Sequence, residues 1–214
     1  MAIGPSPQAL VGSLPPSTLP SMWQHLSKYR IILGSQSPRR VELLRGLDLP
    51  FEQVLLEGVD ESYPATLRPE EIPLYIAQHK AESYRPLLDD QTLLITADTL
   101  VFVEDEVLGK PRTLDEAASM LQRLSGRRHY VTTGVSIRTP QHDLSFADTA
   151  AVDFLPLTSR EIEYYVQHYS PLDKAGAYGI QEWIGYTAIS SIEGSFYTVM
   201  GLPVHLVSKY LKTL

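Results

Sequence analysis

The sequence predicts an α/β fold, either as one domain or as two small lobes that share a core. Short apolar runs that are typical of buried strands alternate with segments in which apolar residues recur at helical spacing. The chain has 214 residues, of which 43% are hydrophobic and 20% charged, as in ordinary globular proteins with a sizeable core. It contains no apolar run of about 18 residues, the length expected of a membrane span. We therefore expect no membrane partner.

The charge balance and the lack of cysteine exclude several classes of function. The net charge is −7, whereas general nucleic-acid binding depends on many Lys and Arg side chains facing phosphates. We therefore expect no nucleic acid as a partner, and any polyanion must bind at a local basic pocket. With 0 Cys, the chain has no disulfide, Cys-ligated zinc, iron–sulfur cluster or thiol nucleophile, which is compatible with the cytoplasm.

The histidines give no sign of a zinc site. None of the 6 His lies three to five residues from another, the spacing of local His-based zinc motifs. A metal would therefore be a hard cation bound by oxygen, such as Mg²⁺ or Mn²⁺.

Residues 1–29 differ in composition from the rest of the chain. They are rich in Pro, Ser and small residues, and they lack the basic start and sustained apolar run of a signal peptide. We interpret them as a loose N-terminal extension, which leaves residues 30–214 as the domain.

The first element of the domain is a strand that leads directly into a helix. Residues 30–34 form a short apolar run, after which Ser37 is a suitable N-cap and Pro38 a suitable first helical residue. Arg39 and Arg40 then lie in the first helical turn, where the helix dipole disfavours cations. A shared polyanion, bound with the help of Ser35 and the free N–H groups, would explain this pair. Taken alone, however, two adjacent arginines are more often a solvated surface pair.

A second strand is expected near 51–56, followed by a helix over about 69–84. In this helix Ile72, Ile76 and His79 fall on one side, and Lys80 lies just past that stripe, at the edge of the core.

The next strand, 92–98, is continuously apolar and is expected to be buried on both faces, with Asp98 at its C-terminal end. Ligands favour that end of α/β sheets. A carboxylate there can bind a cation or accept a proton from water, although a strand-end Asp is as often a turn residue. A hairpin over 100–107 then brings Lys110 to the same place. Lys80 and Lys110 can add charge to a phosphate site, or can simply lie at a core edge with exposed amines.

The remaining elements follow from caps and periodicity. Capping boxes at Thr113 with Glu116, and at Thr158 with Glu161, each predict the start of a helix. Between and after these helices we expect long strands near 129–138 and 143–154, an irregular functional loop over 173–181, short strands near 185–192 and 196–200, and a C-terminal helix from about 203.

Gln181, in that loop, offers a donor and an acceptor from one amide. This pair complements the carbonyl and N3–H of a uracil or thymine edge, whereas a loop Gln without a ligand is usually only solvated. The sequence contains no nucleophile elbow, Walker A loop or dinucleotide-binding fingerprint.

Several short motifs follow one another in a fixed order. They are SQSPRRVELL at 35–44, KA at 80–81, ADT at 97–99, GKP at 109–111, LSG at 124–126, PLDKAGAYGIQ at 171–181 and VMGLP at 199–203. From about residue 30 to the C terminus, this order resembles the Maf family of nucleotide pyrophosphatases.

The resemblance implies a mixed, twisted sheet with flanking helices and two lobes around a cleft, similar to the inosine-triphosphate pyrophosphatases, and commonly a homodimer. It implies a divalent metal and attack of water on the α-phosphate of a nucleoside triphosphate, with release of pyrophosphate. Asp98 would be the proton acceptor or a metal-side carboxylate, and Arg40, Lys80 and Lys110 would hold the triphosphate. Glu61 is our leading candidate for a further metal ligand.

Three positions bear on the substrate. Arg39, Thr99 and Gln181 match those that mark the dTTP/UTP subclass, whereas the 7-methyl-GTP subclass has Trp, Gln and Glu there. Two rival readings stay open: a pyrophosphatase for modified nucleotides such as 7-methyl-GTP, and a nucleotide-binding regulator of septum formation. The sequence also leaves open whether Glu42 or Lys174 joins the site.

The chain departs from the family pattern at three positions. Gly34 stands where Ala is common, and His79 where Glu is common. Thr96 replaces a common Gly, and it is the departure that could alter how the backbone approaches a ligand.

Overall fold

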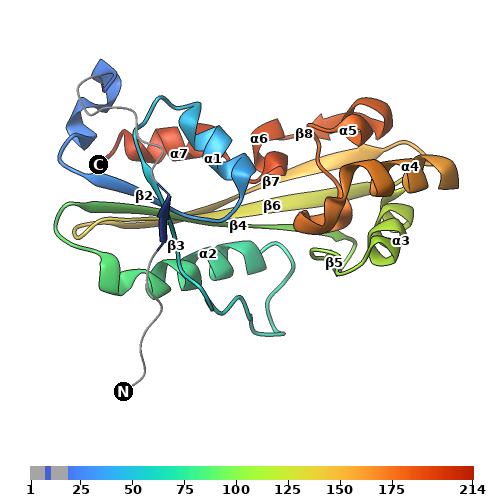
Figure 1. Cartoon of the computed structure of the whole chain (residues 1–214), viewed down its shortest axis with the longest axis horizontal. Helices are drawn as coiled ribbons and strands as arrows, with labels where there is room; N and C mark the ends of the chain where they lie inside the picture. The colour runs from blue at the N-terminus through green and yellow to red at the C-terminus, as the bar shows by residue number, and fades with distance from the viewer. Residues whose placement is uncertain (1–7, 11–18) are drawn as a thin grey trace.

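The computed structural model describes residues 8–10 and 19–214, which are built around one eight-stranded mixed sheet (Figure 1). The strand order is β1-β3-β2-β4-β6-β7-β8, with β5 paired to β4. β2 runs parallel to β3 and β4, and the other pairs are antiparallel. The strands are β1 (Gln8–Leu10), β2 (Arg30–Gly34), β3 (Glu52–Leu55), β4 (Thr92–Val103), β5 (Glu106–Leu108), β6 (Arg128–Arg138), β7 (Asp143–Phe154) and β8 (Ile189–Glu193). The predicted α/β class with a mixed sheet is confirmed.

Helices cover both faces of this sheet. Figure 1 shows α2 on one face and α1, α6 and α7 on the other, while α3, α4 and α5 gather at one end of the molecule. The α-helices are α1 (Pro38–Arg45), α2 (Ile72–Ser83), α3 (Leu114–Leu124), α4 (Ser159–Tyr169), α5 (Trp183–Ala188), α6 (Phe196–Met200) and α7 (Val204–Leu211). Short 3-10 helices are η2 (Ser21–Leu26), η3 (Arg85–Leu87), η4 (Pro171–Asp173) and η5 (Ala175–Ala177).

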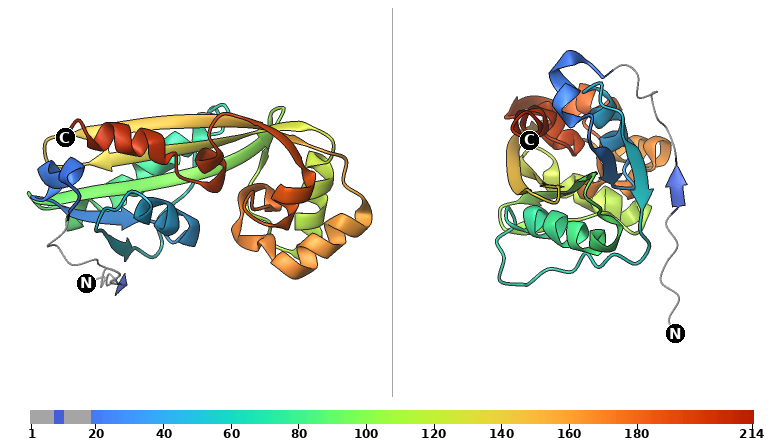
Figure 2. Two further views of the ribbon diagram at one scale, coloured as in Figure 1. Left: turned by 90° about the horizontal axis from the view of Figure 1, so that it is seen from above. Right: turned by 90° about the vertical axis from the view of Figure 1, so that its left-hand side faces the viewer.

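The long strands β4, β6 and β7 run through two lobes (Figure 2). Along one edge of β4, β2 pairs only as far as Thr96, and β5 begins to pair only at Val101. The residues between, Ala97–Leu100, pair with neither of these strands, so this edge opens where one lobe gives way to the next. Asp98 was expected at a strand end, and this expectation is wrong, because β6 pairs with β4 throughout and keeps the strand going. The predicted two lobes are confirmed (Figure 2), and Asp98 and Thr99 at this open edge line a cleft, as was also predicted.

Near the C terminus, the strand expected at 185–192 is only partly confirmed, and the strand expected at 196–200 is wrong. Residues 183–188 are helical and only Ile189–Glu193 form a strand, while Phe196–Met200 are helix α6 rather than a strand. Aromatic and β-branched residues favour strands, but here tertiary contacts override that preference. The Thr198 carbonyl accepts a hydrogen bond from the Thr133 hydroxyl at 2.8 Å, and Gly201, with φ of 114°, ends the helix in a left-handed turn.

Two helix details also differ from expectation. His79 is exposed, because the buried stripe of α2 continues from Ile76 through Ala77 and Ala81. At α3, Thr113 caps the helix, but the Glu116 carboxylate accepts from the Arg112 N–H, so that capping box is only half formed. The box at the start of α4 is complete.

The segment expected to be a loose extension is partly packed. Residues 1–7 and 11–18 lie outside the described part of the chain. Gln8–Leu10 pair with β3, and Trp23 and Leu26 of η2 are buried in the main core. The Trp23 indole donates to the Leu47 carbonyl at 2.8 Å, which fixes η2 against the end of α1.

Candidate active site

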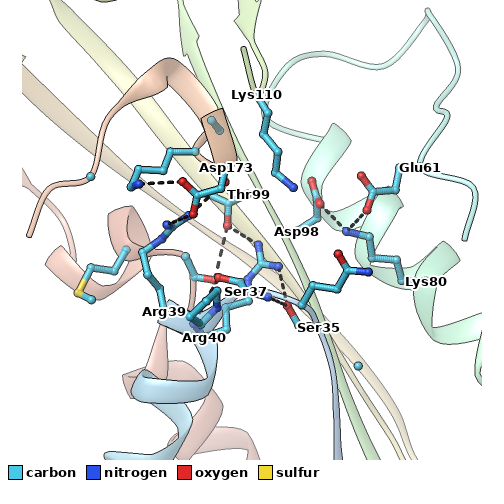
Figure 3. Close-up of a pocket in the computed structure, with 18 of the residues that line it drawn as sticks. Ser35, Ser37, Arg39, Arg40, Glu61, Lys80, Asp98, Thr99, Lys110 and Asp173 are labelled. Carbon is cyan, nitrogen blue, oxygen red and sulfur yellow. Dashed lines mark hydrogen bonds and ion pairs between the residues drawn. The ribbon is translucent and has the colours of Figure 1, made fainter. Parts of the chain in front are cut away.

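A cleft of about 360 Å³ opens where β4 passes between the lobes (Figure 3). It is lined by the start of α1, the loop before α2, the middle of β4, the irregular segment after α4 and the turn at Gly201. Every residue predicted to bind substrate or metal lines it: Ser35, Arg39, Arg40, Glu61, Lys80, Asp98, Thr99, Lys110 and Gln181. Of the two residues left open, Lys174 lines the cleft, whereas Glu42 is exposed and is not among the lining residues.

The first wall of the cleft is the turn from β2 into α1. Ser37 is the N-cap, and its hydroxyl accepts the Arg40 N–H at 3.4 Å, as the sequence predicts. Pro38 then begins the helix. This turn aims the Arg40 side chain back across the strands, toward the cleft floor.

Arg40 is 9% exposed and ties four segments together. Its Nε donates to the Gly201 carbonyl at 2.8 Å, Nη1 to the Ser35 hydroxyl at 3.1 Å and Nη2 to the Thr99 hydroxyl at 2.9 Å. The Thr99 hydroxyl also lies 2.9 Å from the Thr133 hydroxyl, so it is hydrogen-bonded to two protein side chains, Arg40 and Thr133. Burial lowers the pKa of the Arg40 guanidinium, whereas the charge of Asp98 raises it.

At one end of the cleft, a lysine joins two carboxylates (Figure 3). Lys80 Nζ lies 2.8 Å from Asp98 Oδ1 and 2.8 Å from Glu61 Oε1. Lys80 and Asp98 are mostly buried, while Glu61 is half exposed. Burial alone would raise the pKa of Glu61, but the hydrogen bond and charge of Lys80 more than offset this, so the pKa is lowered. This carboxylate is therefore ionised at neutral pH.

Lys110 adds a free positive charge beside this group. It is exposed and forms no ion pair with any described residue, and its charge helps to lower the pKa of Glu61. Its neighbour Gly109 accepts the Gly176 N–H at 3.1 Å, which holds the lysine segment against the irregular loop.

The other end of the cleft contains Arg39 and Gln181. Arg39 Nη1 donates to Asp173 Oδ2 at 2.9 Å, across the cleft from α1 to η4. Gln181 Oε1 is buried without a hydrogen-bond partner among residues 8–10 and 19–214. A buried acceptor without a partner is costly, so this amide would gain a hydrogen bond by turning toward a ligand that brings a donor.

Two carboxylates suit a hard divalent cation. Mg²⁺ is commonly held by one or two carboxylates together with water and phosphate oxygens, so Glu61 and Asp98 fit it. Within the described ranges, no three His, Cys, Asp or Glu side chains form a complete metal site. A metal held by these two carboxylates would need further ligands, such as water or phosphate oxygens.

The departures Gly34 and Thr96 explain each other. They are paired across β2 and β4, and a Cβ on Gly34 would lie 3.0 Å from Thr96 Cγ2 and 2.8 Å from Tyr84 Cζ. The Thr96 hydroxyl donates to the Ala77 carbonyl of α2 at 2.7 Å, so its side chain faces away from the cleft.

Sequence reasoning assigned no role to Asp173, Glu182 or Tyr165. Asp173 lies inside a quoted motif, but its partner Arg39 is 134 residues away in the chain. Glu182 follows Gln181 directly, and Tyr165 has the spacing of an ordinary core residue in α4. Only the complete fold brings these three side chains together.

Comparison with known proteins adds relatives over the same part of the chain. The family described as Maf-like protein matches residues 30–214. A dTTP/UTP pyrophosphatase of Porphyromonas gingivalis is 56% identical over 193 residues, covering 89% of this chain and 97% of the relative. A protein of the same name from Parabacteroides distasonis is 52% identical over 191 residues, covering 89% and 99%.

Two solved structures also align with this chain. The Staphylococcus aureus Ham1 protein covers 86% of this chain and 98% of its own, with a TM-score of 0.48 and 15% identity. A nucleoside-triphosphatase described as a dITP/XTP pyrophosphatase, from Mycobacterium abscessus, covers 60% and 75%, with a TM-score of 0.39 and 20% identity. Across residues 8–10 and 19–214, none of the helices is long and apolar enough to cross a membrane.

Proposed function

This chain belongs to the Maf-like protein family, and we propose that it hydrolyses nucleoside triphosphates, chiefly dTTP and UTP, to the monophosphate and pyrophosphate. One observation carries the proposal. A single cleft gathers five basic side chains, three carboxylates and an unpaired amide. Such a cleft offers positive charge to bind a polyphosphate, a carboxylate to accept a proton from water and an amide to form hydrogen bonds with a nucleobase.

The basic side chains bind and orient the triphosphate. Lys110 has no ion-pair partner among the described residues and is free to bind a phosphate oxygen. Arg40 and Lys80 add charge from the cleft floor and from α2, and Arg40 is held in place by its three hydrogen bonds. Fixed charges in a partly buried cleft stabilise the negative charge that develops as the anhydride bond breaks.

Asp98 is the proposed proton acceptor. Water attacks the α-phosphorus, the bond from that phosphorus to the oxygen bridging to the β-phosphate breaks, and pyrophosphate leaves. The proton of the attacking water goes to Asp98, whose carboxylate is oriented by Lys80 at 2.8 Å.

Glu61 and Asp98 would hold the proposed Mg²⁺ or Mn²⁺. The donor set supports this assignment, since both side chains offer carboxylate oxygens. Lys80 pairs with Oε1 of Glu61 and Oδ1 of Asp98, which leaves the second oxygen of each carboxylate for a cation. The bound cation would supply Lewis-acid stabilisation of negative charge on the phosphate oxygens.

Gln181 is the proposed reader of the base. Its unpaired Oε1 can accept the N3–H of uracil or thymine, while its amide N–H donates to the 4-carbonyl. Cytosine presents the opposite pattern at these two positions, so the same amide orientation leaves both contacts unmade. Arg39 and Thr99 complete the three positions that match the dTTP/UTP subclass.

A panel of nucleotides tests this function. The purified protein is incubated with dTTP, UTP, CTP, ATP, GTP and 7-methyl-GTP in Mg²⁺ or Mn²⁺, and pyrophosphate and monophosphate are measured. We expect kcat/KM for dTTP and UTP to exceed the others by about 10-fold or more, since one lost hydrogen bond costs about 1.4 kcal/mol.

Each other outcome excludes part of the proposal. Equal rates on all triphosphates refute the role of Gln181, and release of single phosphate refutes cleavage between the α- and β-phosphates. A preference for 7-methyl-GTP assigns the other subclass. Tight nucleotide binding without turnover would favour a regulator of septum formation.

We also propose a homodimer and a cytoplasmic location, where nucleoside triphosphates are abundant. The homodimer is what the resemblance to the Maf family implies. Light scattering tests this, with a mass of about twice the monomer expected and a monomer mass refuting it.

A further inference from the structure

A chain of charged contacts crosses the cleft at the end away from Lys80. Arg39 on α1 donates to the Asp173 carboxylate at 2.9 Å, and the other oxygen of Asp173 accepts from Lys174 Nζ at 2.7 Å. Lys174 Nζ also lies 3.1 Å from Glu182 Oε1. We call these four side chains, Arg39, Asp173, Lys174 and Glu182, the cleft bridge. The Arg39 end, with Asp173, lies opposite the Lys80 group in Figure 3.

The centre of the cleft bridge is buried. Lys174 is only 7% exposed, and a lysine is rarely so buried unless it is paired. Burial alone would raise the pKa of Asp173, but Lys174 and then Arg39 lower it below its ordinary value. Charged groups that are paired in a buried place resist separation, because one left without its partner loses both water and counter-charge.

The cleft bridge ends on the turn that presents Gln181. The Glu182 carboxylate accepts the hydroxyl of Tyr165, a fully buried residue of α4, and this hydroxyl accepts the Gly179 N–H at 2.9 Å. Burial and then the Glu182 hydrogen bond raise the pKa of Tyr165, so its hydroxyl keeps the proton that it donates.

The Glu182 side chain also packs directly on this turn. A Cβ on Gly179 would lie 2.7 Å from Glu182 Cδ, and the Glu182 N–H donates to the Gly179 carbonyl at 3.0 Å. The turn is therefore held through its backbone and by a side chain, with Gln181 between the two fixed residues.

We propose that Lys174 and Glu182 are positioning residues that join Arg39 and Gln181 into one base-selecting unit. The inference rests on the proposed function and adds a physical basis for its selectivity. The contact between Arg39 and Asp173 links α1 to the far wall, so the cleft cannot widen there without separating paired charges. A purine is larger than a pyrimidine by a fused five-membered ring, so a cleft closed by this contact accommodates it less readily.

The test measures kcat and KM for UTP and for GTP in variants of the cleft bridge. Lys174→Met combined with Glu182→Gln removes one positive and one negative charge, so no additional net charge is left in the buried centre. Asp173→Asn is a second variant at a more exposed position, with 56% of the side chain accessible, and it weakens only the link to Arg39 and Lys174. Arg123→Gln, which breaks an exposed ion pair with Glu106 outside the cleft, is the matched control.

We expect the ratio of kcat/KM for UTP over GTP to fall at least 10-fold in both variants and to stay unchanged in the control. KM for UTP rises while its kcat stays within about threefold, because Asp98 and Lys80 are untouched. If these residues had only a structural role, kcat/KM would fall alike for UTP and GTP, and the ratio would be preserved.

The outcomes separate this inference from the proposed function. A wild-type protein that does not hydrolyse UTP, or that does not prefer it, refutes the function. A selective wild type whose folded Asp173→Asn variant keeps the ratio within twofold refutes the positioning role and leaves the function standing. The Asp173→Asn result decides the question even if the double variant does not fold.

Discussion

Replacing Arg40 by lysine tests whether this arginine acts as a fork rather than as a simple charge. In the structure its guanidinium donates to three acceptors on three separate segments, at distances of 2.8, 3.1 and 2.9 Å. A lysine ammonium carries the same charge, but it cannot reach three acceptors that are arranged around a planar group. Arg40→Lys should therefore lose at least two hydrogen bonds.

The expected loss of stability follows from those bonds. A hydrogen bond to a charged group contributes about 1.5–3 kcal/mol, so two of them amount to about 3 kcal/mol at the lower end. For a domain of this size each kcal/mol lowers Tm by about 2–4 °C, which predicts a decrease of about 6–12 °C.

Thermal and urea unfolding without nucleotide measure this effect. Arg39→Lys is the matched control at the next position, where the side chain is 21% exposed and has one carboxylate partner, so its cost should be about 1 kcal/mol or less. Equal decreases in Tm for the two variants would refute the account of Arg40 as a tie between segments.

Two further predictions concern the core. Gly34→Ala should lower the free energy of unfolding by about 1–3 kcal/mol, because the new methyl group meets the ring of Tyr84 at 2.8 Å. Gly109→Ala is the control and should lower it less, because a Cβ there has no neighbour within 4 Å. Equal urea midpoints for the two variants would contradict this. Burial lowers the pKa of His129 from 6.5 to about 4. The contribution of its neutral ring to the free energy of unfolding is therefore fully present above pH 6.5. It is lost as the pH falls toward 4, by about 1.4 kcal/mol per pH unit. The free energy of unfolding should show this slope, and His129→Gln should flatten it; an unchanged slope would exclude His129 as its source.

Local chemistry explains which elements could be predicted from the sequence. Ser37 with Pro38 marks the start of α1 by capping and by a fixed φ, both of which depend only on neighbours in the chain. The continuous apolar run before Asp98 likewise predicts a buried strand. Apart from Glu61, the predicted residues of the cleft lie in short motifs whose order along the chain can be recognised from the sequence alone.

The parts that could not be predicted depend on distant contacts. The length of β4 beyond Asp98 is set by its pairing with β6, which begins some thirty residues later, so the expected strand end was wrong. Helix α6 forms in a segment of strand-favouring residues, because Thr133 and the turn at Gly201 fix its backbone. The contact of Arg39 with Asp173 joins residues 134 positions apart, and no local pattern indicates it.

The central claim is that Asp98 accepts the proton of the water that attacks the triphosphate. Asp98→Asn keeps the shape of the side chain and an oxygen acceptor for Lys80, so the variant should fold with a similar Tm. The most direct measurement is pyrophosphate release from UTP by wild type and Asp98→Asn, side by side in the same divalent metal. The account predicts rapid release by the wild type and a loss of at least about 100-fold in the folded variant. Undiminished release by Asp98→Asn would contradict it.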